Sequence, residues 1–366
     1  MSKKYDITFV GHMCYDEIIP FGGKPHIAPG SAVLCGAMVA PRVGKKVAAV
    51  VKMAKKDENI LQPMKDAGVD TYLIPSAETT YSRVLHYSAN VDERKLTLVK
   101  SAGLISIKDV PALSSTCVHL AGISDTEFDL ALMKGLKSRG YSLSTDMQSF
   151  VRHVAPVTHD IEYSDVANKK EIAVMMDKLK LDIVEAKILT GTDDLEKAGI
   201  VVESWGCPEI LITHSQGVLA RVKGKTYYEK FSNSNSSGRT GRGDTTFSAY
   251  LSWRLDHDVA TSLKFAAALV SIKMETPGPF KGTLEDVAKR LKEKHSAPSS
   301  WSTAGSTPTS NAGPAAAATP CATRFAVTPA SPVVAVITHA ASPRSSGCVN
   351  ERRASRTFPP FKNPAP

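Results

Sequence analysis

Residues 236–251, SSGRTGRGDTTFSAYL, place three glycines, two arginines and one aspartate directly before an apolar segment. Glycine permits positive φ and lets the main chain approach a ligand closely. The apolar residues that follow Asp244 recur at three- and four-residue spacing, which predicts a helix. The first N–H groups of a helix lack partners and carry partial positive charge, so a glycine-rich start favours an anion. We therefore expect this segment to bind a phosphate group, with Arg239 and Arg242 adding positive charge.

Other interpretations of the same segment are open. Asp244 is also consistent with an ordinary N-cap that accepts a hydrogen bond from Thr246 or Phe247. Residues 242–244 form an Arg-Gly-Asp adhesion tripeptide, although here the tripeptide leads into an apolar helix. The G-x-x-x-x-G-K-[ST] loop is excluded, because no Lys-Ser/Thr pair follows the last glycine. The remaining interpretation is a phosphate-transfer site in which Asp244 contacts the reacting group.

The segment TGRGD, residues 240–244, resembles the T-G-A-G-D signature of the ribokinase-like (PfkB-type) carbohydrate kinases. Other landmarks of that family follow in order over roughly residues 5–282. The resemblance implies transfer of the γ-phosphoryl group of ATP to a hydroxyl of a sugar or cyclic polyol. It implies that Asp244 accepts the hydroxyl proton, and that the anion hole contains Gly241, Arg242 and Gly243.

The family resemblance also implies which residues bind the substrate. They are Asp16, Gly30, Ser31, Gln148 and Arg152. A carboxylate such as Asp16 suits a polyol, because it accepts several short O–H hydrogen bonds. Leu34 stands where the family usually has a sugar-binding asparagine, which argues against an ordinary pentose. The stretch DMQSFVR, residues 146–152, resembles the D-x-Q-x-x-x-R stretch of the myo-inositol kinase branch. The expected substrate is therefore a cyclic polyol.

Three further parts of the sequence bear on how the phosphoryl donor and its cations are bound. In LDIVEAKILTG, Asp182 and Glu185 are two carboxylates near the donor, which favours Mg²⁺ held largely through water. The segment ILITHSQG matches the loop that lines the nucleotide, and it contributes Thr213, Ser215 and Gly217. Gly238 stands where many relatives have an aspartate linked to a monovalent-cation site, so a need for potassium stays open.

Short apolar strands alternate with amphipathic helices around these motifs. The expected strands are YDITFVG, VAAVVKM, CVHLAG, YSLSTD, LDIVEA and PEILITHS, and expected helices include EFDLALMKGLKSRG and TSLKFAAALVSIKM. This alternation predicts an α/β fold with a mostly parallel sheet, in which ligands bind beyond the carboxyl ends of the strands. The resemblance implies a ribokinase-like fold, with helices on both faces and a small β lid over about residues 17–29 and 72–102. An edge hairpin without a closure role is the alternative to the lid.

The composition divides the chain near residue 296. We expect a kinase domain over residues 1–295 and a disordered Ser/Ala/Pro-rich tail over 296–366, for which a non-native extension such as a shifted reading frame is an equal alternative. The formal net charge is +9, but the tail has six basic residues against one acidic residue, so no nucleic-acid partner is expected. The six scattered cysteines and the absence of a long apolar run favour a cytoplasmic protein that does not bind a membrane. A homodimer through the lid is left open.

Two alternative functions remain. A nucleoside kinase of the same fold would need aromatic residues in the lid to stack a base, and Tyr81 and Tyr87 are candidates. A non-catalytic sugar- or nucleotide-binding sensor is suggested by the departures from the family at Pro29, Leu34, Asp182 and Ser215. The histidines are spaced too irregularly for a metal site, and structural roles are expected for His12, His86, His119 and His214.

Overall fold

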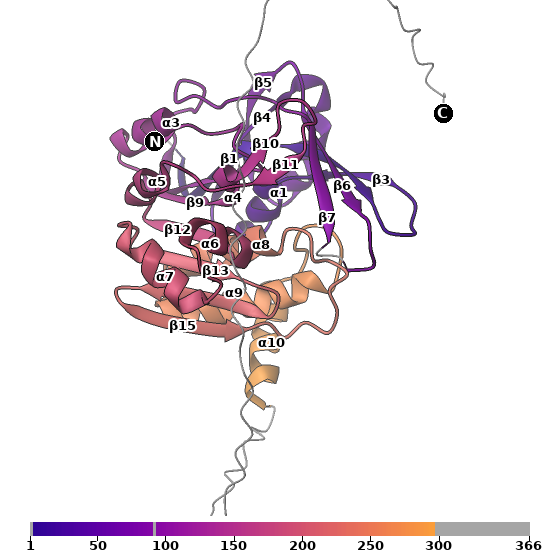
Figure 1. The fold of residues 1–366 in the computed structure, drawn as a ribbon. Coiled ribbons are helices and arrows are strands. Elements are labelled where there is room, and N and C mark those ends of the chain that lie inside the picture. The colour runs from indigo at the N-terminus through magenta and orange to yellow at the C-terminus, as the bar shows by residue number, and fades with distance from the viewer. Residues whose placement is uncertain (1–2, 91–92, 297–366) are drawn as a thin grey trace, which may run out of the picture. The chain divides into compact units, whose positions relative to one another are not determined.

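The computed structural model describes residues 3–90 and 93–296. They lie in one compact unit, Met1–Trp301, and residues 297–366 of the expected tail lie outside the described residues. The unit is a large sheet between two layers of helices, with a smaller sheet that projects from it on the right of Figure 1. The ribokinase-like α/β architecture expected from the sequence is confirmed.

The large sheet has the order β15-β14-β13-β12-β9-β8-β1-β4-β5. Its strands are β1 (Lys4–His12), β4 (Val47–Ala54), β5 (Asp70–Ser76), β8 (Ser114–Leu120), β9 (Ser142–Asp146), β12 (Lys178–Asp182), β13 (Glu209–Thr213), β14 (Gly217–Val222) and β15 (Lys225–Lys230). Neighbours from β5 to β13 are parallel, whereas β14 and β15 are antiparallel additions at one edge. The carboxyl ends of the parallel strands therefore meet at one edge of the sheet.

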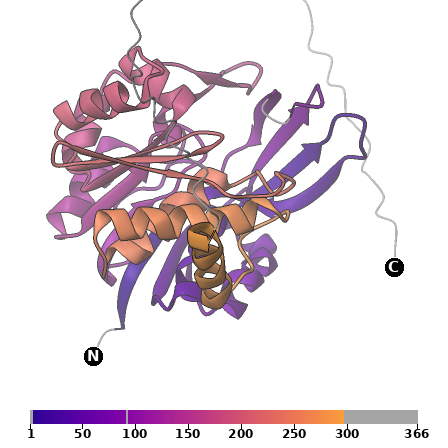
Figure 2. The same ribbon diagram turned by 90° about the horizontal axis from the view of Figure 1, so that it is seen from below.

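Both faces of this sheet are covered. One layer contains α1 (Ala32–Ala37), α2 (Gln62–Asp66), α8 (Arg242–Arg254), α9 (Val259–Met274) and α10 (Leu284–Ser296), with the 3-10 turns η1 (Ala40–Val43) and η2 (Lys55–Leu61). The other contains α3 (Leu130–Ser138), α4 (Gln148–Val151), α5 (Lys169–Met175), α6 (Ile183–Thr190) and α7 (Leu195–Ser204). Successive side chains of β1 alternate between them, since Phe9 packs in the first core and Val10 in the second. Figure 2 shows α9 and α10, in orange, together on the first face.

The small sheet has the order β3-β2-β6-β7 and is called the lid below, although a role in closure stays a prediction. Its strands are β2 (Cys14–Ile19), β3 (His26–Gly30), β6 (Thr80–His86) and β7 (Arg94–Lys100). The second lid segment begins later than expected from sequence, because β5 pairs in parallel with β4 and belongs to the large sheet. A two-stranded ribbon, β10 (Arg152–Val154) and β11 (Ile161–Tyr163), lies next to β7.

The expected strand LDIVEA is corrected by the structure. The strand β12 ends at Asp182, and α6 begins at the next residue. The Asp182 carboxylate accepts the N–H of Glu185 at 2.9 Å, and the Glu185 carboxylate accepts the N–H of Asp182 at 2.7 Å. This reciprocal capping box satisfies two N–H groups at the helix start, and it outweighs the β preference of Ile183 and Val184.

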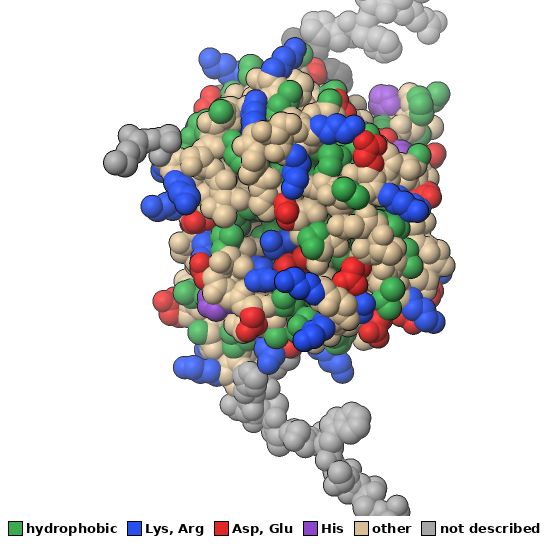
Figure 3. All heavy atoms as spheres, turned by 90° about the vertical axis from the view of Figure 1, so that its left-hand side faces the viewer, with side chains coloured by type: hydrophobic (Ala, Val, Ile, Leu, Met, Phe, Trp, Pro, Cys, Tyr) green, Lys and Arg blue, Asp and Glu red, His purple; other side chains and the backbone are tan. Residues whose placement is uncertain are grey.

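Basic and acidic side chains are interspersed on the face seen in Figure 3. Exposed pairs on the surface include Lys134 with Glu171 at 2.7 Å and Lys187 with Asp193 at 3.1 Å. Such pairs contribute little to stability, because water screens both charges. Within residues 3–90 and 93–296, the helices are too short or too polar for any of them to cross a membrane.

Candidate active site

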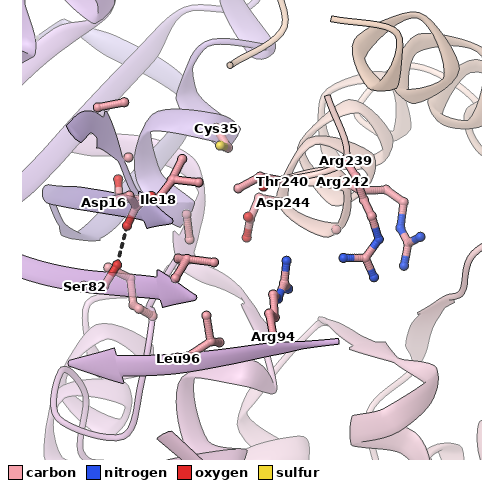
Figure 4. Close-up of a pocket in the computed structure, with 18 of the residues that line it drawn as sticks. Asp16, Ile18, Cys35, Ser82, Arg94, Leu96, Arg239, Thr240, Arg242 and Asp244 are labelled. Atoms are coloured by element: carbon pink, nitrogen blue, oxygen red, sulfur yellow. Dashed lines mark hydrogen bonds between the residues drawn. The ribbon is translucent and has the colours of Figure 1, made fainter. Parts of the chain in front are cut away.

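A cavity of about 610 Å³ lies between the lid and the large sheet. The sequence-predicted residues that line it are Asp16, Gly30, Ser31, Gln148, Arg152, Asp182, Thr213, Gly241, Arg242, Gly243 and Asp244. Glu185, Ser215 and Gly217 are not among its lining residues. The fold therefore brings segments from six separate parts of the chain to one cavity. Figure 4 shows Asp244 between Asp16 on one side and Arg239 and Arg242 on the other.

The helix α8 begins earlier than the sequence suggested. Its N-cap is Gly241, with φ 78°, and Asp244 is the third helical residue. The interpretation of Asp244 as an ordinary N-cap is therefore wrong. Its Oδ1 instead accepts a hydrogen bond from Gln148 Nε2 at 3.2 Å. This contact holds the carboxylate at the floor of the cavity and leaves oxygen lone pairs to accept another hydrogen bond.

The start of α8 presents main-chain donors to the cavity. The N–H groups of Gly241, Gly243 and Asp244 have no hydrogen-bond acceptor within the described part of the chain. The N–H of Arg242, expected in the same anion hole, instead donates to the carbonyl of Arg239 at 3.0 Å. Partnerless N–H groups at the positive end of a helix form a site for an anion. The guanidinium of Arg242, which also lines the cavity, adds a positive charge near these donors.

Glycine is required twice in this turn. A Cβ at Gly241 would lie 2.5 Å from Cys35 Sγ, and the backbone there has positive φ. A Cβ at Gly243 would lie 2.7 Å from the ammonium of Lys180. Both separations are shorter than van der Waals contact, so the glycines let a thiol and an ammonium group pack directly against the loop.

Basic side chains converge on this cavity. Arg152 and Arg239 were expected near the ligand from the sequence, whereas Arg94 was missed. The lid strand β7 contributes Arg94, which points towards Asp244 in Figure 4. Burial, followed by repulsion from Arg152, lowers the pKa of Arg94. Arg152 also lines the cavity, with its guanidinium 5.8 Å from the ring centroid of Tyr163. On the wall of the cavity, burial and the charge of Arg242 lower the pKa of Arg239 to about 10. Crowding of like charges in a buried space favours an anionic ligand that would neutralise them.

Lys180 is buried beneath the loop at 3% exposure. Its Nζ lies 2.7 Å from Asp146 Oδ2 and 3.9 Å from Glu185 Oε2. Burial opposes its charge, but attraction to Asp146 and then Glu185 outweighs burial and raises the pKa of Lys180. A sequence signal was present, because Lys180 is the charged residue between two leucines of a buried strand.

The two expected metal residues take different positions. The Asp182 side chain lines the cavity, whereas Glu185 lies behind it and is fully buried. Burial, followed by repulsion from Asp182, raises the pKa of Glu185 to about 8. Within the described residues no group of three His, Cys, Asp or Glu side chains could hold a metal ion. Of the two expected metal residues only Asp182 faces the cavity, and one such carboxylate fits Mg²⁺ that keeps most of its water and takes few protein ligands.

On the lid side of the cavity, neighbouring side chains hold the Asp16 carboxylate. Its Oδ1 accepts hydrogen bonds from Ser82 Oγ, dashed in Figure 4, and from Cys14 Sγ at 3.3 Å. Burial raises the pKa of Asp16. A Cβ at Gly30 would lie 1.9 Å from Asp16 Oδ2, so only glycine leaves room for this carboxylate.

Ser31 has an unusual backbone for a residue with a side chain, at φ 145° and ψ 163°. Its Oγ caps α1 by accepting the N–H of Leu34 at 2.9 Å. Such a conformation is almost confined to glycine, and it is retained where the surroundings impose it, often at ligand sites. The strained residue thus lies in the wall of the cavity.

Of the three residues expected at a nucleotide, Thr213 lines the cavity, whereas Ser215 and Gly217 do not. His214, next to Ser215, stacks on Tyr228 with ring centroids 5.7 Å apart. Neither Tyr81 nor Tyr87 lines the cavity. Among the Phe, Tyr and Trp residues that the structure describes, Phe21 is the one in the lining.

Comparisons with known proteins agree with this geometry. No family model matches the chain. A solved pyrophosphate-dependent kinase in the ribokinase family, in its sulfate complex, is 32% identical, with a TM-score of 0.72 over 77% of this chain and 99% of the other. A pyrophosphate-dependent kinase of that family, complexed with a pyrophosphate analogue and myo-inositol, is 30% identical, with a TM-score of 0.70 over 77% and 99% of the two chains.

A more distant relative is the cytidine kinase of Thermococcus kodakarensis, which is 24% identical over 221 residues, 58% of this chain and 75% of the other. All three relatives are kinases, which speaks against the non-catalytic sensor. The identity to the solved ribokinase-family kinases extends over nearly their whole length. The chain therefore belongs to the ribokinase family and is a kinase for a sugar, polyol or nucleoside.

Proposed function

We propose that this kinase transfers a phosphoryl group from pyrophosphate to a hydroxyl of a cyclic polyol of the inositol class. The observation that carries the choice of donor is the arginine pair at one end of the cavity, Arg239 and Arg242, beside the N–H groups of the α8 start. A small, highly charged donor needs such cations and no binding site for a base. Ser215 and Gly217, which would serve a nucleotide, lie outside the cavity lining. The pyrophosphate dependence of the two solved relatives supports the same choice over ATP.

The acceptor end suits a ring with hydroxyls on its edge and C–H bonds on its faces. Asp16 and Gln148 supply polar groups, and Ile18, Leu34 and Leu96 supply apolar contacts. Leu34 makes no hydrogen bond to a hydroxyl, so a sugar that depends on an amide contact there is disfavoured. The myo-inositol complex of one relative supports a cyclic polyol.

The chain's own groups account for the transfer as positioning and electrostatics. Asp16 would hold the polyol so that one hydroxyl points to Asp244, and Asp244 would accept the proton of that hydroxyl. The N–H groups of Gly241 and Gly243 would bind the oxygens of the transferred group, where negative charge develops. Asp182 would hold Mg²⁺ through water, and the ion would supply further positive charge to the donor.

A factorial screen tests the proposal. Pyrophosphate and ATP, each with Mg²⁺, are offered with myo-inositol, ribose, fructose and cytidine, and product formation is followed. We expect turnover with pyrophosphate and myo-inositol to exceed that of every other pair. Higher turnover with ATP would refute the donor, and a preference for ribose or cytidine would refute the acceptor.

Substitution of the arginines separates the donor end from the acceptor end. Arg242→Ala and Arg239→Ala should each raise KM for pyrophosphate, with a much smaller effect on KM for myo-inositol. Removing a charge-assisted hydrogen bond of this kind is worth about 1.5–3 kcal/mol, or roughly ten- to a hundredfold. Arg83→Ala is the matched control, because Arg83 pairs with Glu17 on the lid and does not line the cavity. Equal effects on both KM values would contradict the assignment.

A further inference from the structure

The loop before α8 encloses a buried ammonium group. Lys273, in the last turn of α9, is 1% exposed, and its Nζ donates hydrogen bonds to the carbonyl oxygens of Gly238 and Thr240. The ammonium lies 3.9 Å from the position that a Cβ at Gly241 would occupy. Within the described residues Lys273 forms no ion pair, so main-chain carbonyl dipoles are the groups that directly coordinate its charge. Main-chain carbonyl oxygens of this kind are also ligands that a bound monovalent metal ion would take.

A monovalent metal ion does not fit this loop. The resemblance places a cation-linked aspartate at position 238, but the residue is glycine. A Cβ there would lie 1.9 Å from the carbonyl oxygen of Thr276 and 2.7 Å from that of Lys273. The N–H of Gly238 also donates to the carbonyl of Met274 at 2.7 Å, which fixes the loop on the end of α9. No carboxylate can therefore enter at position 238, and the carbonyl oxygens are already bound to an ammonium.

We propose that the Lys273 ammonium acts as a tethered monovalent cation, which orients the phosphate-binding loop and makes this kinase independent of potassium. In a trans peptide the C=O and N–H bonds point in opposite directions. Because Lys273 holds the Thr240 carbonyl, the N–H of Gly241 in the same peptide points away from Lys273. Gly241 lines the cavity, and its N–H has no acceptor in the described structure, so this donor is left for the ligand.

Lys273 is thus a positioning residue that acts through the main chain. Its covalent attachment removes the binding equilibrium that a free ion would require, so the loop is ordered at any salt composition. The charge also lies behind the anion hole and favours an anion there at short range. The inference rests on the proposed function only in that the loop binds a phosphate group, and it is independent of the identity of the donor and the polyol.

The wild-type protein provides the first test. Its melting temperature and its turnover are measured in chloride salts of sodium, potassium and tetramethylammonium at equal ionic strength. We expect the three salts to agree within about twofold in turnover and to give the same melting temperature, because a ligand that does not bind the native state does not stabilise it. Potassium-specific stabilisation, or a several-fold stimulation by potassium, would overturn the proposal. The melting measurement needs no substrate, so it stands even where the activity screen fails.

The second test uses Lys273→Met, which removes the charge and leaves an unbranched side chain one heavy atom shorter. We expect kcat to fall roughly a hundredfold, as for a small misplacement of catalytic groups, while KM for the polyol changes little. Potassium or ammonium should partly restore turnover and raise the melting temperature of the variant, whereas tetramethylammonium is too large to do so. Lys264→Met, at an exposed position of the same helix, is the matched control.

A folded Lys273→Met variant with wild-type turnover would show that the ammonium does not position the loop. Equal responses of this variant to potassium and tetramethylammonium would show that the carbonyl oxygens are not a cation site. If the variant does not fold, the salt series on the wild-type protein decides the question alone.

Discussion

Replacement of Asp244 by asparagine tests the centre of the proposed mechanism. Asp244 lies at the third position of α8 and accepts a hydrogen bond from Gln148, while Gly241 is the N-cap. Asparagine retains an oxygen for Gln148, and no cap is lost. The change removes one negative charge from the positive end of a helix, worth roughly 0.3–1 kcal/mol. Loss of repulsion with Asp16 and Asp146 offsets part of this. We therefore expect the free energy of unfolding to change by less than about 1 kcal/mol.

The kinetic effect should be much larger. An amide cannot accept the hydroxyl proton, and a positioned general base typically contributes ~10²–10⁴ in rate. We expect kcat of Asp244→Asn to fall by that factor, with little change in KM for the donor. Steady-state kinetics and thermal or chemical unfolding of the same preparations provide the measurement.

Asp258 offers a matched control at the start of α9. Its Oδ1 caps the helix by accepting the N–H of Thr261 at 2.7 Å, and it does not line the cavity. Asp258→Ala should cost about 0.5–2 kcal/mol of stability and leave turnover unchanged, because a true N-cap is lost. Asp244→Ala should show the opposite pattern. An Asp244→Asn variant with near wild-type turnover would refute the reasoning.

Three further changes test individual contacts. Gly30→Ala places a Cβ 1.9 Å from Asp16 Oδ2 and must displace this carboxylate. KM for the polyol should therefore rise about tenfold or more, while KM for pyrophosphate is unchanged. An unaffected KM for the polyol would contradict the role of Asp16. Ser31→Gly should raise the midpoint of chemical unfolding, because it relieves a strain of order 1–3 kcal/mol and the lost cap costs only a few tenths of a kcal/mol. Ser31→Ala should lower the midpoint, because it loses the cap and keeps the strain. For Glu185, the folded pKa of about 8 exceeds its ordinary 4.5, so its stabilising contribution is complete below pH 4.5 and is lost as pH rises to about 8. Wild type should therefore lose stability relative to Glu185→Gln over that window, by at most ~1.4 kcal/mol per pH unit. A difference in free energy of unfolding between the two proteins that does not change with pH would refute the raised pKa.

Much of the architecture could be predicted from local patterns. Strands such as β1, β4 and β13, and helices α3 and α9, lie where their apolar periodicity placed them. The helix after residues 240–244 was also predicted, although its start was placed too late by two residues. The segment LDIVEA was predicted wrongly as a strand, since its apolar content fits a buried strand and a buried helix equally. The capping box at Asp182 and Glu185 was the local signal that distinguishes them.

The candidate site was predicted only in part. Asp16 and Asp244 follow motifs, and each lines the cavity. Lys180 and Arg94 also line it, but the sequence analysis did not select them. Arg94 is one of many basic residues in the chain, and its neighbours in the sequence do not indicate where its charge lies. Lys180 had a local signal, because two leucines flank it in a buried strand, but that signal does not identify its partners.

The sequence by itself determined the alternation of strands and helices and the glycine-rich start of α8, because both depend on periodicity and on residues close in the chain. Only the tertiary structure decided that Lys273 on α9 reaches the carbonyl oxygens of Gly238 and Thr240, and that Arg94 on the lid faces Asp244. The physical reason is distance along the chain. Charges that are far apart in sequence meet only when parallel strands and their crossovers stack, and the energy of a buried charge depends on that final arrangement of partners.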